Sequence, residues 1–493
     1  MSQARAILSN TVVQIIGKAV SAIVSVLIVK IITNYLSVEG YGEYTAIYEF
    51  LALFAIAADL GLFTIGVREM SKDEDKIQKI AGNILGLRMV LAIIMMTLAT
   101  LAAFLIPKYD NTLIPIGCAI AGLTTVFSLL NGTVAIVLQV KLKMHWMAIT
   151  FILGRLVTLA YMVYIVFYGI PEATSQGFYH LLVAGVLGNG LMFVGTAFFA
   201  NRYVKLRPQF DLALWKSTIK ESLPYGMAII LNAVYFRVDS ILLSLMKGTG
   251  EVGLYGVPMR MLEVMTVIPL YFMNSVLPVL TKSMKEKTDK YKKIIQYSWE
   301  FLISMAAPIM TGTVLLAYPI IYLIASPDFL SKLEEGFYGS DVALQILIFA
   351  MGFQFLNVLF AFLLISVGKQ SKLLYINAAC VLFNIIGNII LIPEYGFRGA
   401  AFTSVLSELF ILIGTFIAAR HYMKFKIELG GTLKILFSTA VMGVVVYFLK
   451  DRMFEFAQAK GVFLMIPIAV LVYAGMLFLT GAISREKLKM LKR

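Results

Sequence analysis

The sequence places twelve ionisable side chains inside long apolar segments, where hydrocarbon would surround them. A charge near the centre of a bilayer costs about 2.5–3.5 kcal/mol or more, so such a residue usually faces a cavity or a partner. The six basic residues are Lys18, Lys30, Arg88, Arg155, Arg237 and Arg260. The six acidic residues are Glu49, Asp59, Asp239, Glu263, Glu300 and Glu408. Because cations predominate before residue 210 and acids after it, we expect a first half that attracts anions and an acidic second half.

A polar stripe runs along the first apolar segment. Its members, spaced three or four residues apart, are Asn10, Gln14, Lys18, Ser21 and Ser25. That spacing places them on one face of a helix. A continuous polar face is costly against lipid, so we expect the stripe to line a central cavity.

The chemistry expected in that cavity is recognition of an anionic headgroup such as a pyrophosphate. Ammonium and guanidinium groups donate charge-assisted hydrogen bonds to phosphate oxygens, and a guanidinium binds two oxygens at once. The predicted headgroup contacts are Lys18, Arg88, Arg155, Gln14 and Arg237. Lys18 is the leading candidate because it stands in the middle of the polar stripe.

Three of the cations also have a structural interpretation. Lys30 stands near the end of its segment, where a long side chain extends its ammonium group into the outer headgroup region. The alternative for Arg88 and Arg155 is an ion pair within the protein, for example with Asp59, or a side chain that extends to the inner membrane surface.

The acidic residues likewise include some with a structural interpretation and one that is a candidate for function. Glu263 follows Arg260 by three residues, a spacing that predicts a pair along one helical face. Glu300 lies within two turns of two lysines and is expected to reach the inner interface. Glu408 stands in the middle of its segment without a partner nearby in sequence, so it is the more informative acid and a candidate for ion coupling.

The elements that must position these residues are membrane-spanning helices. Of 493 residues, 60% are hydrophobic and 14% are charged, whereas soluble domains have about 45–50% apolar and about 25% charged residues. The expected fold is an all-α integral membrane protein with about fourteen transmembrane helices, each long enough to cross about 30 Å of hydrocarbon. The expected segments are 10–33, 43–66, 78–106, 112–138, 146–168, 177–200, 220–246, 252–280, 294–325, 341–366, 372–392, 398–420, 432–449 and 462–482.

The loops carry an orientation signal. Alternate loops hold 29 Lys and Arg residues, against 7 in the other set. Because strongly basic loops stay in the cytoplasm, we expect both termini to be cytoplasmic and the protein to be a multi-pass protein of the cell membrane. The net charge of +14 is therefore a signal of membrane orientation, and nucleic acid is not an expected partner.

Weak internal repetition divides the chain. Gly42-Glu43-Tyr44 and Gly253-Leu254-Tyr255 each open an apolar segment, with an offset of 211 residues, and Ile-Pro-Glu recurs at 170–172 and 392–394. Parallel repeats of this kind form two lobes that rock around a central site. We expect lobes at 1–210 and 211–427, six helices each and related by a pseudo-two-fold axis, with two extra spans and a basic tail at 428–493. The alternative is that Gly and Pro simply recur at helix ends.

Residues for catalysis or for a resident metal are sparse in the sequence. The two cysteines, Cys118 and Cys380, lie in apolar stretches, and His145, His180 and His421 are isolated near predicted membrane edges. The sequence has no glycine-rich phosphate-binding loop that ends in Lys-Ser or Lys-Thr. An enzyme is therefore not expected, nor any cofactor other than a coupling ion.

A turn motif carries a family resemblance. Residues 384–404 read Asn384-Ile-Ile-Gly-Asn388-Ile-Ile-Leu-Ile-Pro393-Glu-Tyr-Gly396-Phe-Arg-Gly399-Ala-Ala-Phe-Thr403-Ser404. This turn resembles the hallmark of the polysaccharide-transporter branch, the Wzx-like O-antigen repeat-unit flippases, of the multidrug/oligosaccharidyl-lipid/polysaccharide flippase superfamily. Asp59-Leu-Gly61-Leu, and Asp239 followed by a Gly-x-Tyr opening and Pro278, are also similar to that branch. The resemblance covers residues 8–425.

The resemblance implies translocation of a polyprenyl-pyrophosphate-linked oligosaccharide from the inner to the outer leaflet, for assembly of a cell-surface polysaccharide. The implied partners are the lipid-linked oligosaccharide and membrane lipids, and a monomer is compatible with the sequence. The chain lacks the signature that the lipid II flippase branch carries in spans 1 and 2. It also lacks the acidic residue that drug and cation antiporters of the superfamily often carry in span 1.

The resemblance also implies a coupling ion. In lipid II flippase relatives a sodium ion is held between span 7 and spans 11 and 12, and the residues here that resemble its ligands are Asp239, Asn384, Asn388 and Ser404. Oxygen donors suit a hard cation such as Na⁺. The second span-11 ligand is Asn388 instead of a carboxylate, so proton coupling through Asp239 or Glu408 is an alternative. A further alternative is that the asparagines form hydrogen bonds between helices.

The function expected from these observations is an ion-coupled flippase with alternating access. One alternative is an ion-coupled exporter of small organic cations or drugs, which would use the acids of the second lobe. Another is a passive lipid scramblase. The last two spans are expected to add a lipid-facing groove for a polyprenyl tail.

Overall fold

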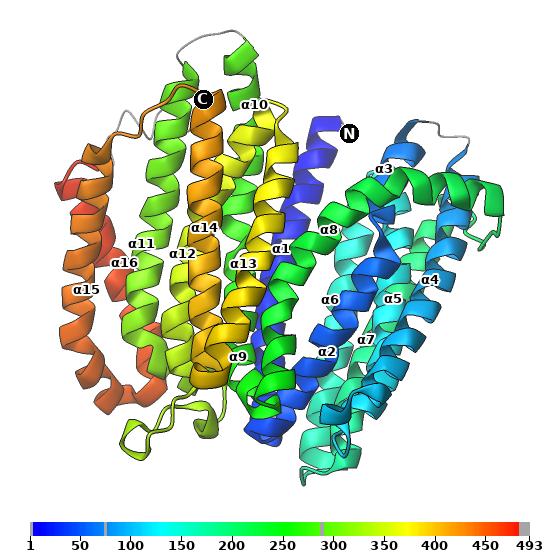
Figure 1. The fold of residues 1–493 in the computed structure, drawn as a ribbon, viewed down its shortest axis with the longest axis horizontal. Coiled ribbons are helices and arrows are strands. Elements are labelled where there is room, and N and C mark those ends of the chain that lie inside the picture. Colours follow the sequence, from blue (N-terminus) through cyan, green and yellow to red (C-terminus); the bar gives the residue numbers. More distant parts are fainter. Residues whose placement is uncertain (1–2, 73–75, 286–289, 483–493) are drawn as a thin grey trace. The chain divides into compact units, whose positions relative to one another are not determined.

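The computed structural model describes residues 3–72, 76–285 and 290–482, and the regular elements in these ranges are helices (Figure 1). They divide into two compact units, unit 1 (Met1–Gly253) and unit 2 (Leu254–Arg493). The α-helices of unit 1 are α1 Gln3–Tyr35, α2 Val38–Asp59, α3 Leu62–Lys72, α4 Ile77–Leu105, α5 Ile114–Val140, α6 Met144–Tyr164, α7 Ser175–Asn201 and α8 Leu212–Met246. A 3₁₀ turn, Pro107–Tyr109, follows α4, and a π-helical turn, Ile165–Gly169, ends α6.

The helices of unit 2 follow helix α9, Thr249–Met265, which begins just before the division. They are α10 Val267–Lys285, α11 Lys290–Ile324, α12 Ser340–Ser366, α13 Gln370–Tyr395, α14 Phe397–Tyr422, α15 Leu429–Ala457 and α16 Val462–Leu479. Short 3₁₀ turns lie at Pro327–Phe329, Leu333–Glu335 and Gln458–Gly461.

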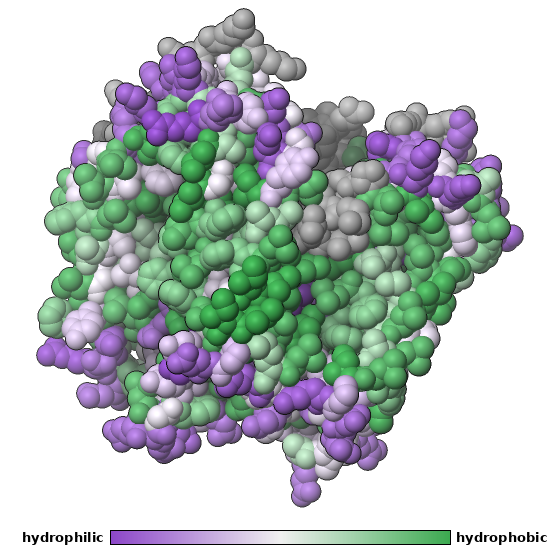
Figure 2. All heavy atoms as spheres, in the orientation of Figure 1, coloured by the Kyte–Doolittle hydropathy of each residue, from purple (hydrophilic) through white to green (hydrophobic). Residues whose placement is uncertain are grey.

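The expected all-helical membrane fold is confirmed. Eleven helical stretches within the described residues are long and apolar enough to cross a membrane, and one of them, Leu429–Leu479, contains both α15 and α16. Helices α1 and α8 correspond to the expected segments 10–33 and 220–246. In Figure 2, hydrophobic side chains cover the middle of the helices in each unit and hydrophilic ones gather at the helix ends, as a bilayer requires.

The helix expected at 43–66 is interrupted. Helix α2 ends at Asp59, and the next two residues, Leu60 and Gly61, have positive φ values of 44° and 75°. Glycine adopts that conformation freely, and the Leu60 N–H still bonds to the Ile56 carbonyl at 3.0 Å. The break therefore leaves the carboxyl group of Asp59 at a helix end inside the unit.

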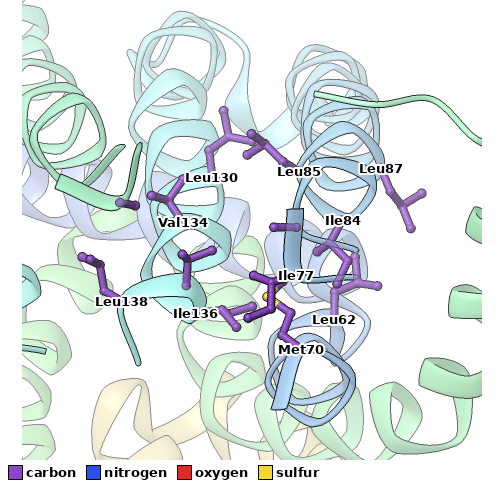
Figure 3. Close-up of a cluster of buried hydrophobic side chains, with 13 residues drawn as sticks. Leu62, Met70, Ile77, Ile84, Leu85, Leu87, Leu130, Val134, Ile136 and Leu138 are labelled. Atoms are coloured by element: carbon purple, nitrogen blue, oxygen red, sulfur yellow. The ribbon is translucent and has the colours of Figure 1, made fainter. Parts of the chain in front are cut away.

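The core of unit 1 joins α3, α4 and α5 at one end of the unit. Its buried members include Leu62, Met70, Ile84, Leu130 and Val134 (Figure 3). Large aliphatic side chains on these three helices interdigitate, and their burial away from water stabilises the packing. This core fixes the position of α4, which carries Arg88.

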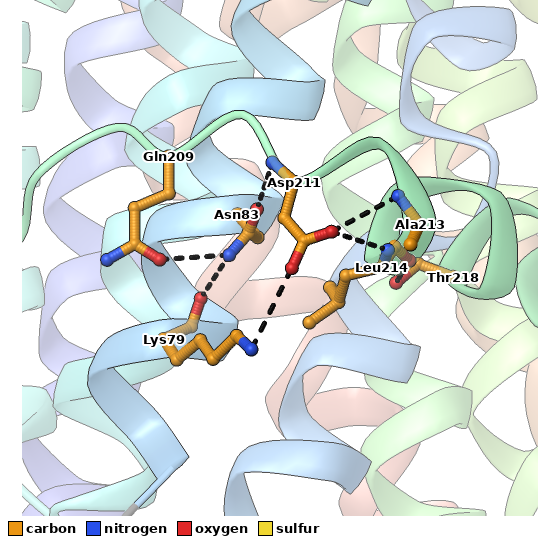
Figure 4. A network of polar contacts seen from close by, with 7 residues as sticks. All are labelled: Lys79, Asn83, Gln209, Asp211, Ala213, Leu214 and Thr218. Atoms are coloured by element: carbon orange, nitrogen blue, oxygen red, sulfur yellow. Dashed lines mark hydrogen bonds and ion pairs between the residues drawn. The ribbon is translucent and has the colours of Figure 1, made fainter.

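A network around Asn83 ties α8 to α4 (Figure 4). The Asn83 side-chain amide donates to Gln209 Oε1 at 2.9 Å, and its oxygen accepts the Asp211 N–H at 2.9 Å. The Asn83 carbonyl accepts from Trp215 Nε1 at 3.0 Å. Asp211 also caps the first turn of α8 by accepting the N–H groups of residues 213 and 214. These bonds fix the start of α8 in unit 1.

This network explains where the two units divide. The expected lobes meet at residue 210, whereas the compact units meet at Gly253, so α8 belongs to unit 1. Two ion pairs, Arg68–Glu221 and Arg237–Glu49, also join α8 to α3 and α2. The expected functional lobes at 1–210, 211–427 and 428–493 remain a prediction.

In unit 2, α12 lies between α11 and α14 and packs against both. Aromatic rings fill the interface near one end, where Phe360 of α12 contacts Phe416 of α14 and Phe425, with ring centroids 5.2 and 6.2 Å apart. Helix α15 packs on the other side of α11. Unit 2 is therefore a layered bundle in which α11 contacts both the inner helix α12 and the late helix α15.

Candidate functional site

Among the described side chains, Arg88 is the most deeply buried cation that the sequence singles out. Its side chain is 1% exposed and forms an ion pair with Asp59. Arg88 Nη1 also donates to Thr133 Oγ1 at 2.8 Å and to the Leu129 carbonyl at 3.2 Å. Gly132 leaves room for the guanidinium, since a Cβ there would lie 3.2 Å from Nη1. The ion pair between Arg88 and Asp59, the structural alternative to headgroup binding by Arg88, is thus present. Its carboxylate belongs to the last residue of α2, where the helix is interrupted.

Arg237 also has an acidic partner. It forms an ion pair with Glu49 of α2, and the exposed fractions of the two side chains are 27% and 8%. A buried carboxylate is tolerated when a cation compensates it. Arg237 is therefore held between α8 and α2 by a charge that balances its own, and its contact with an anionic headgroup remains a prediction.

Arg155 lies half-buried on α6, with its guanidinium carbon 5.5 Å from the centroid of the Phe151 ring. This distance is within the range of a cation–π contact. The side chains of Gln14 and Lys18 lie outside the described residues, although both positions belong to helix α1. The predicted roles of these three residues therefore stay predictions.

The asparagines of α13 are fully buried and face α14. Asn384 Nδ2 donates to Ser407 Oγ at 3.3 Å, and Asn388 Nδ2 donates to Asn384 Oδ1 at 3.0 Å. Ser404 Oγ lies 3.2 Å from the hydroxyl of Tyr255. A hydrogen bond between helices, the alternative expected for these asparagines, is thus present at Asn384, whereas the bond from Asn388 to Asn384 lies within α13.

The predicted sodium ligands do not share one unit. Asp239, which is 5% exposed, belongs to α8 in unit 1, whereas Asn384, Asn388 and Ser404 belong to unit 2. Among the described residues, no group of three or more His, Cys, Asp or Glu side chains is placed to hold a metal ion. The sodium site therefore remains a prediction that rests on the resemblance.

Glu408 is buried on α14 with a neutral partner. Asn357 Nδ2 of α12 donates to Glu408 Oε2 at 2.5 Å and to the Glu408 carbonyl at 3.1 Å. The sequence analysis did not single out Asn357. Its signal is the asparagine of the apolar segment 341–366, which also contains two glutamines, Gln345 and Gln354.

The remaining acids lie near the surface of unit 2. Arg260 Nη1 and Glu263 Oε2 are 3.2 Å apart, so the pair expected from their spacing is confirmed. Glu300 accepts a hydrogen bond from Gln296 at 2.9 Å and borders a cavity at the end of unit 2. That cavity is lined largely by basic residues which the sequence analysis treated only as loop charges.

Comparison with known proteins agrees with this architecture. Residues 7–284 match the protein family described as "Polysaccharide biosynthesis protein", and residues 224–390 match the MatE family. An uncharacterised membrane protein of Methanocaldococcus jannaschii, MJ1068, is 30% identical over 217 residues. That match covers 41% of this chain, and the chain spans 40% of that relative.

Solved structures show the same fold. The lipid II flippase MurJ in its inward closed conformation aligns with a TM-score of 0.72 at 17% identity, over 95% of this chain and 98% of that one. An inward-facing multidrug resistance MATE family transporter aligns with a TM-score of 0.62 at 14% identity, over 82% and 94% of the two chains. A transporter of the same superfamily from Pyrococcus furiosus aligns with a TM-score of 0.58 at 14% identity, over 85% and 95%.

The family match extends over more than half of the chain, and the fold is shared with a lipid II flippase and with a multidrug resistance MATE family transporter. The turn motif at 384–404 and the buried charges of α4, α8 and α14 are consistent with that assignment. The chain belongs to the polysaccharide biosynthesis protein family, within the multidrug/oligosaccharidyl-lipid/polysaccharide flippase superfamily.

Proposed function

We propose that the protein moves a polyprenyl-pyrophosphate-linked oligosaccharide from the inner to the outer leaflet of the cell membrane, for the assembly of a cell-surface polysaccharide. The observation that carries the proposal is the match of residues 7–284 to the polysaccharide biosynthesis family. Similarity of fold to a lipid II flippase supports it, since that protein also handles a lipid-linked substrate.

The proposed mechanism is alternating access. The two lobes rock about a central site, and both termini lie in the cytoplasm, as the charge bias of the loops predicts. The headgroup passes through the protein while the polyprenyl tail stays in the bilayer. Lys18 is the proposed first contact of the pyrophosphate because it stands in the middle of the polar stripe, and Arg155, Arg88 and Arg237 are proposed to add guanidinium donors. Gln14 would add a neutral hydrogen-bond donor on the face that carries Lys18.

The proposed energy source is an ion gradient. Buried Glu408 and Asp239 supply groups that could take up a proton, and Asp239 with the oxygens of Asn384, Asn388 and Ser404 would supply ligands for Na⁺. The Asp239→Ala variant separates the two ions. If sodium couples transport through Asp239, this variant loses its response to a sodium gradient, and an unchanged response contradicts the sodium site.

The test of substrate binding uses two lysines of the same helix. In proteoliposomes with a fluorescent polyprenyl-pyrophosphate oligosaccharide, Lys18→Gln is expected to slow translocation by about 10-fold to 100-fold, as expected for loss of one charge-assisted hydrogen bond. Lys30→Gln, the matched control, is expected to change the rate less than about twofold, since its ammonium is expected at the headgroups. Equal effects of the two variants would contradict the proposed contact, and no translocation by the parent protein would contradict the function.

The MatE match at 224–390 supports one alternative, an ion-coupled exporter of small organic cations. That function would use the acids of unit 2, because a cationic drug needs carboxylate partners. A competition experiment distinguishes the exporter of organic cations from the proposed flippase. A lipophilic cation that blocks transport, with an effect removed by Glu408→Gln, would favour the exporter. Transport that needs no ion gradient would instead favour a passive scramblase.

A further inference from the structure

Unit 2 carries a basic cavity at the N-terminal end of α11. The transport mechanism proposed above assigns no role to this cavity. The cavity has a volume of about 810 Å³. The basic residues that line it, within the described part of the chain, are Lys292, Lys293, Arg420, Lys424, Lys426 and Lys434. Two carboxylates, those of Glu300 and Glu428, also line it. The cavity therefore has a marked excess of positive charge and is suited to an anion.

The walls of this cavity are fixed by hydrogen bonds. The Tyr291 hydroxyl donates to the Lys424 carbonyl at 3.0 Å. Gln296 exchanges two bonds with the backbone of Glu428, its amide donating at 2.9 Å and its oxygen accepting at 2.8 Å. Gly431 lies against Glu300, since a Cβ there would come within 2.2 Å of its carboxylate oxygen. The segment after α14 is thus bound to α11, and the cationic side chains extend from a defined frame.

An apolar groove continues from the cavity along the same helices. It has a volume of about 840 Å³ and is lined by α11, α12 and α15. On α11 the lining residues run from 292 through 300 in the cavity to 303 through 315 in the groove, at the three- and four-residue spacing of one helical face. On α15 the cavity is lined by residues 431 and 434, and the groove starts two residues later and is lined by residues 436 through 448 on a different face of that helix.

The groove is apolar and open to the surroundings. Large side chains that line it remain more than half exposed, among them Val444 at 56%, Tyr447 at 55% and Phe448 at 70%. From residue 303 to residue 315 of the groove, α11 rises by about 18 Å, which is more than half of a hydrocarbon core of about 30 Å. The groove is therefore long enough for an acyl chain of one leaflet. Of the two last helices, α15 lines it, whereas no described residue of α16 does.

We propose that the cavity and the groove together bind an anionic phospholipid of the cytoplasmic leaflet, with its phosphodiester among the lysines and one acyl chain in the groove. The charge bias of the loops predicts that this end of unit 2 is cytoplasmic. An anionic phosphodiester complements the basic side chains. The carboxylates of Glu300 and Glu428 suit headgroup hydroxyls such as those of glycerol, and they disfavour a more highly charged pyrophosphate.

The experiment titrates the delipidated full-length protein in detergent with phosphatidylglycerol or phosphatidylcholine and counts bound lipids by native mass spectrometry. One tightly bound phosphatidylglycerol is expected, and weaker binding of phosphatidylcholine. The Lys426→Gln/Lys434→Gln variant is expected to bind phosphatidylglycerol roughly 25-fold more weakly, because each lysine near an anionic lipid contributes on the order of fivefold.

The matched control is Lys369→Gln/Lys372→Gln, which removes two exposed lysines from another basic loop of unit 2 that does not line the cavity. Its affinity for phosphatidylglycerol is expected to equal that of the parent. Thermal unfolding of both double variants confirms that they are folded. If the two double variants bind phosphatidylglycerol equally, the proposed site is wrong.

Two further measurements distinguish a bound phospholipid from a free phosphate or a prenyl pyrophosphate. Ala440→Trp places a large side chain at an exposed position of the groove and is expected to weaken phosphatidylglycerol binding while leaving the fold intact. Inorganic phosphate is expected not to displace the lipid at equal concentration. Displacement by inorganic phosphate would indicate a site for free anions, and displacement by farnesyl pyrophosphate would indicate a prenyl pyrophosphate site; either result would overturn the proposal.

Discussion

Buried charges are held in different ways in the two units. In unit 1, Arg88 of α4 and Arg237 of α8 each pair with a carboxylate of α2. In unit 2, the carboxylate of Glu408 accepts a hydrogen bond from the neutral amide of Asn357. Unit 1 holds eight of the twelve ionisable residues that the apolar segments carry and unit 2 holds four, and the contacts named here differ in kind.

The difference separates structural charges from charges that can titrate. Removing one member of a buried ion pair leaves the other charge uncompensated, so both members are needed for the fold. A carboxyl group that accepts from an amide can still accept that bond after it takes up a proton, because a protonated carboxyl keeps acceptor capacity. The ion pairs of unit 1 are therefore suited to fixing α2 against its neighbours, and the hydrogen bond from Asn357 to Glu408 does not itself depend on the charge of the carboxyl group.

The largest effect should follow from breaking the pair between Arg88 and Asp59. The variant Arg88→Met is expected to lower the free energy of unfolding by about 3 kcal/mol, because Asp59 loses its countercharge inside the unit. Thermal or chemical unfolding in detergent measures this change. The double variant Arg88→Met/Asp59→Asn is expected to recover part of the loss, and a double variant no more stable than the single one would contradict the pairing.

Arg155→Met is the matched control for that experiment. Its guanidinium is half-buried and lies over an aromatic ring. Loss of a cation–π contact is expected to cost about 1 kcal/mol. An equal loss of stability in Arg88→Met and Arg155→Met would remove the distinction between a fully buried cation and a half-buried one.

A smaller effect is expected from the amide that supports Glu408. Asn357→Leu removes the donor and is expected to cost about 1–3 kcal/mol, because a buried acceptor loses its hydrogen bond. Glu408→Gln keeps an acceptor oxygen toward Asn357, so its cost is expected to stay near or below about 1 kcal/mol. Unfolding free energies of both variants check the difference. If Glu408→Gln proved the more damaging change, the charge itself would be stabilising the bundle.

The smallest effect is expected for the pair between Arg260 and Glu263, whose side chains are 34% and 44% exposed. Arg260→Gln is expected to change the unfolding free energy by less than about 0.5 kcal/mol, since exposed pairs along one helix contribute little. The melting temperature of this variant should match that of the parent. A shift as large as that of Asn357→Leu would show that the pair is stabilised by more than local geometry.

The helical fold and its segments could be predicted from the sequence because each span is an apolar run long enough to cross a bilayer. Every expected segment lies on helical structure, although two of them, 43–66 and 252–280, are each divided between two consecutive helices. The pairing of Arg260 with Glu263 three residues later also followed from the sequence. Such contacts depend only on helical periodicity.

Contacts between helices were less accessible to sequence reasoning, because they depend on how each helix rotates about its axis and on which helices are neighbours. The sequence offered Asp59 as one alternative partner of Arg88, but it gave no partner for Arg237 or Glu408. The break after Asp59 was missed as well, although Gly61 is a residue type that permits it. The basic cavity was missed because its lysines are scattered over three stretches of sequence.

The Asn83 network has a consequence for motion within unit 1. The connection from α7 to α8 is bonded to α4 through side chain and backbone, and the backbone of Gln209 lies so close to Gly86 that a Cβ there would come within 2.2 Å of its carbonyl oxygen. This connection therefore holds the start of α8 firmly against α4. Any displacement of the first turn of α8 must carry α4 with it, so residues 207–211 are a poor place to insert a tag or a fluorescent reporter.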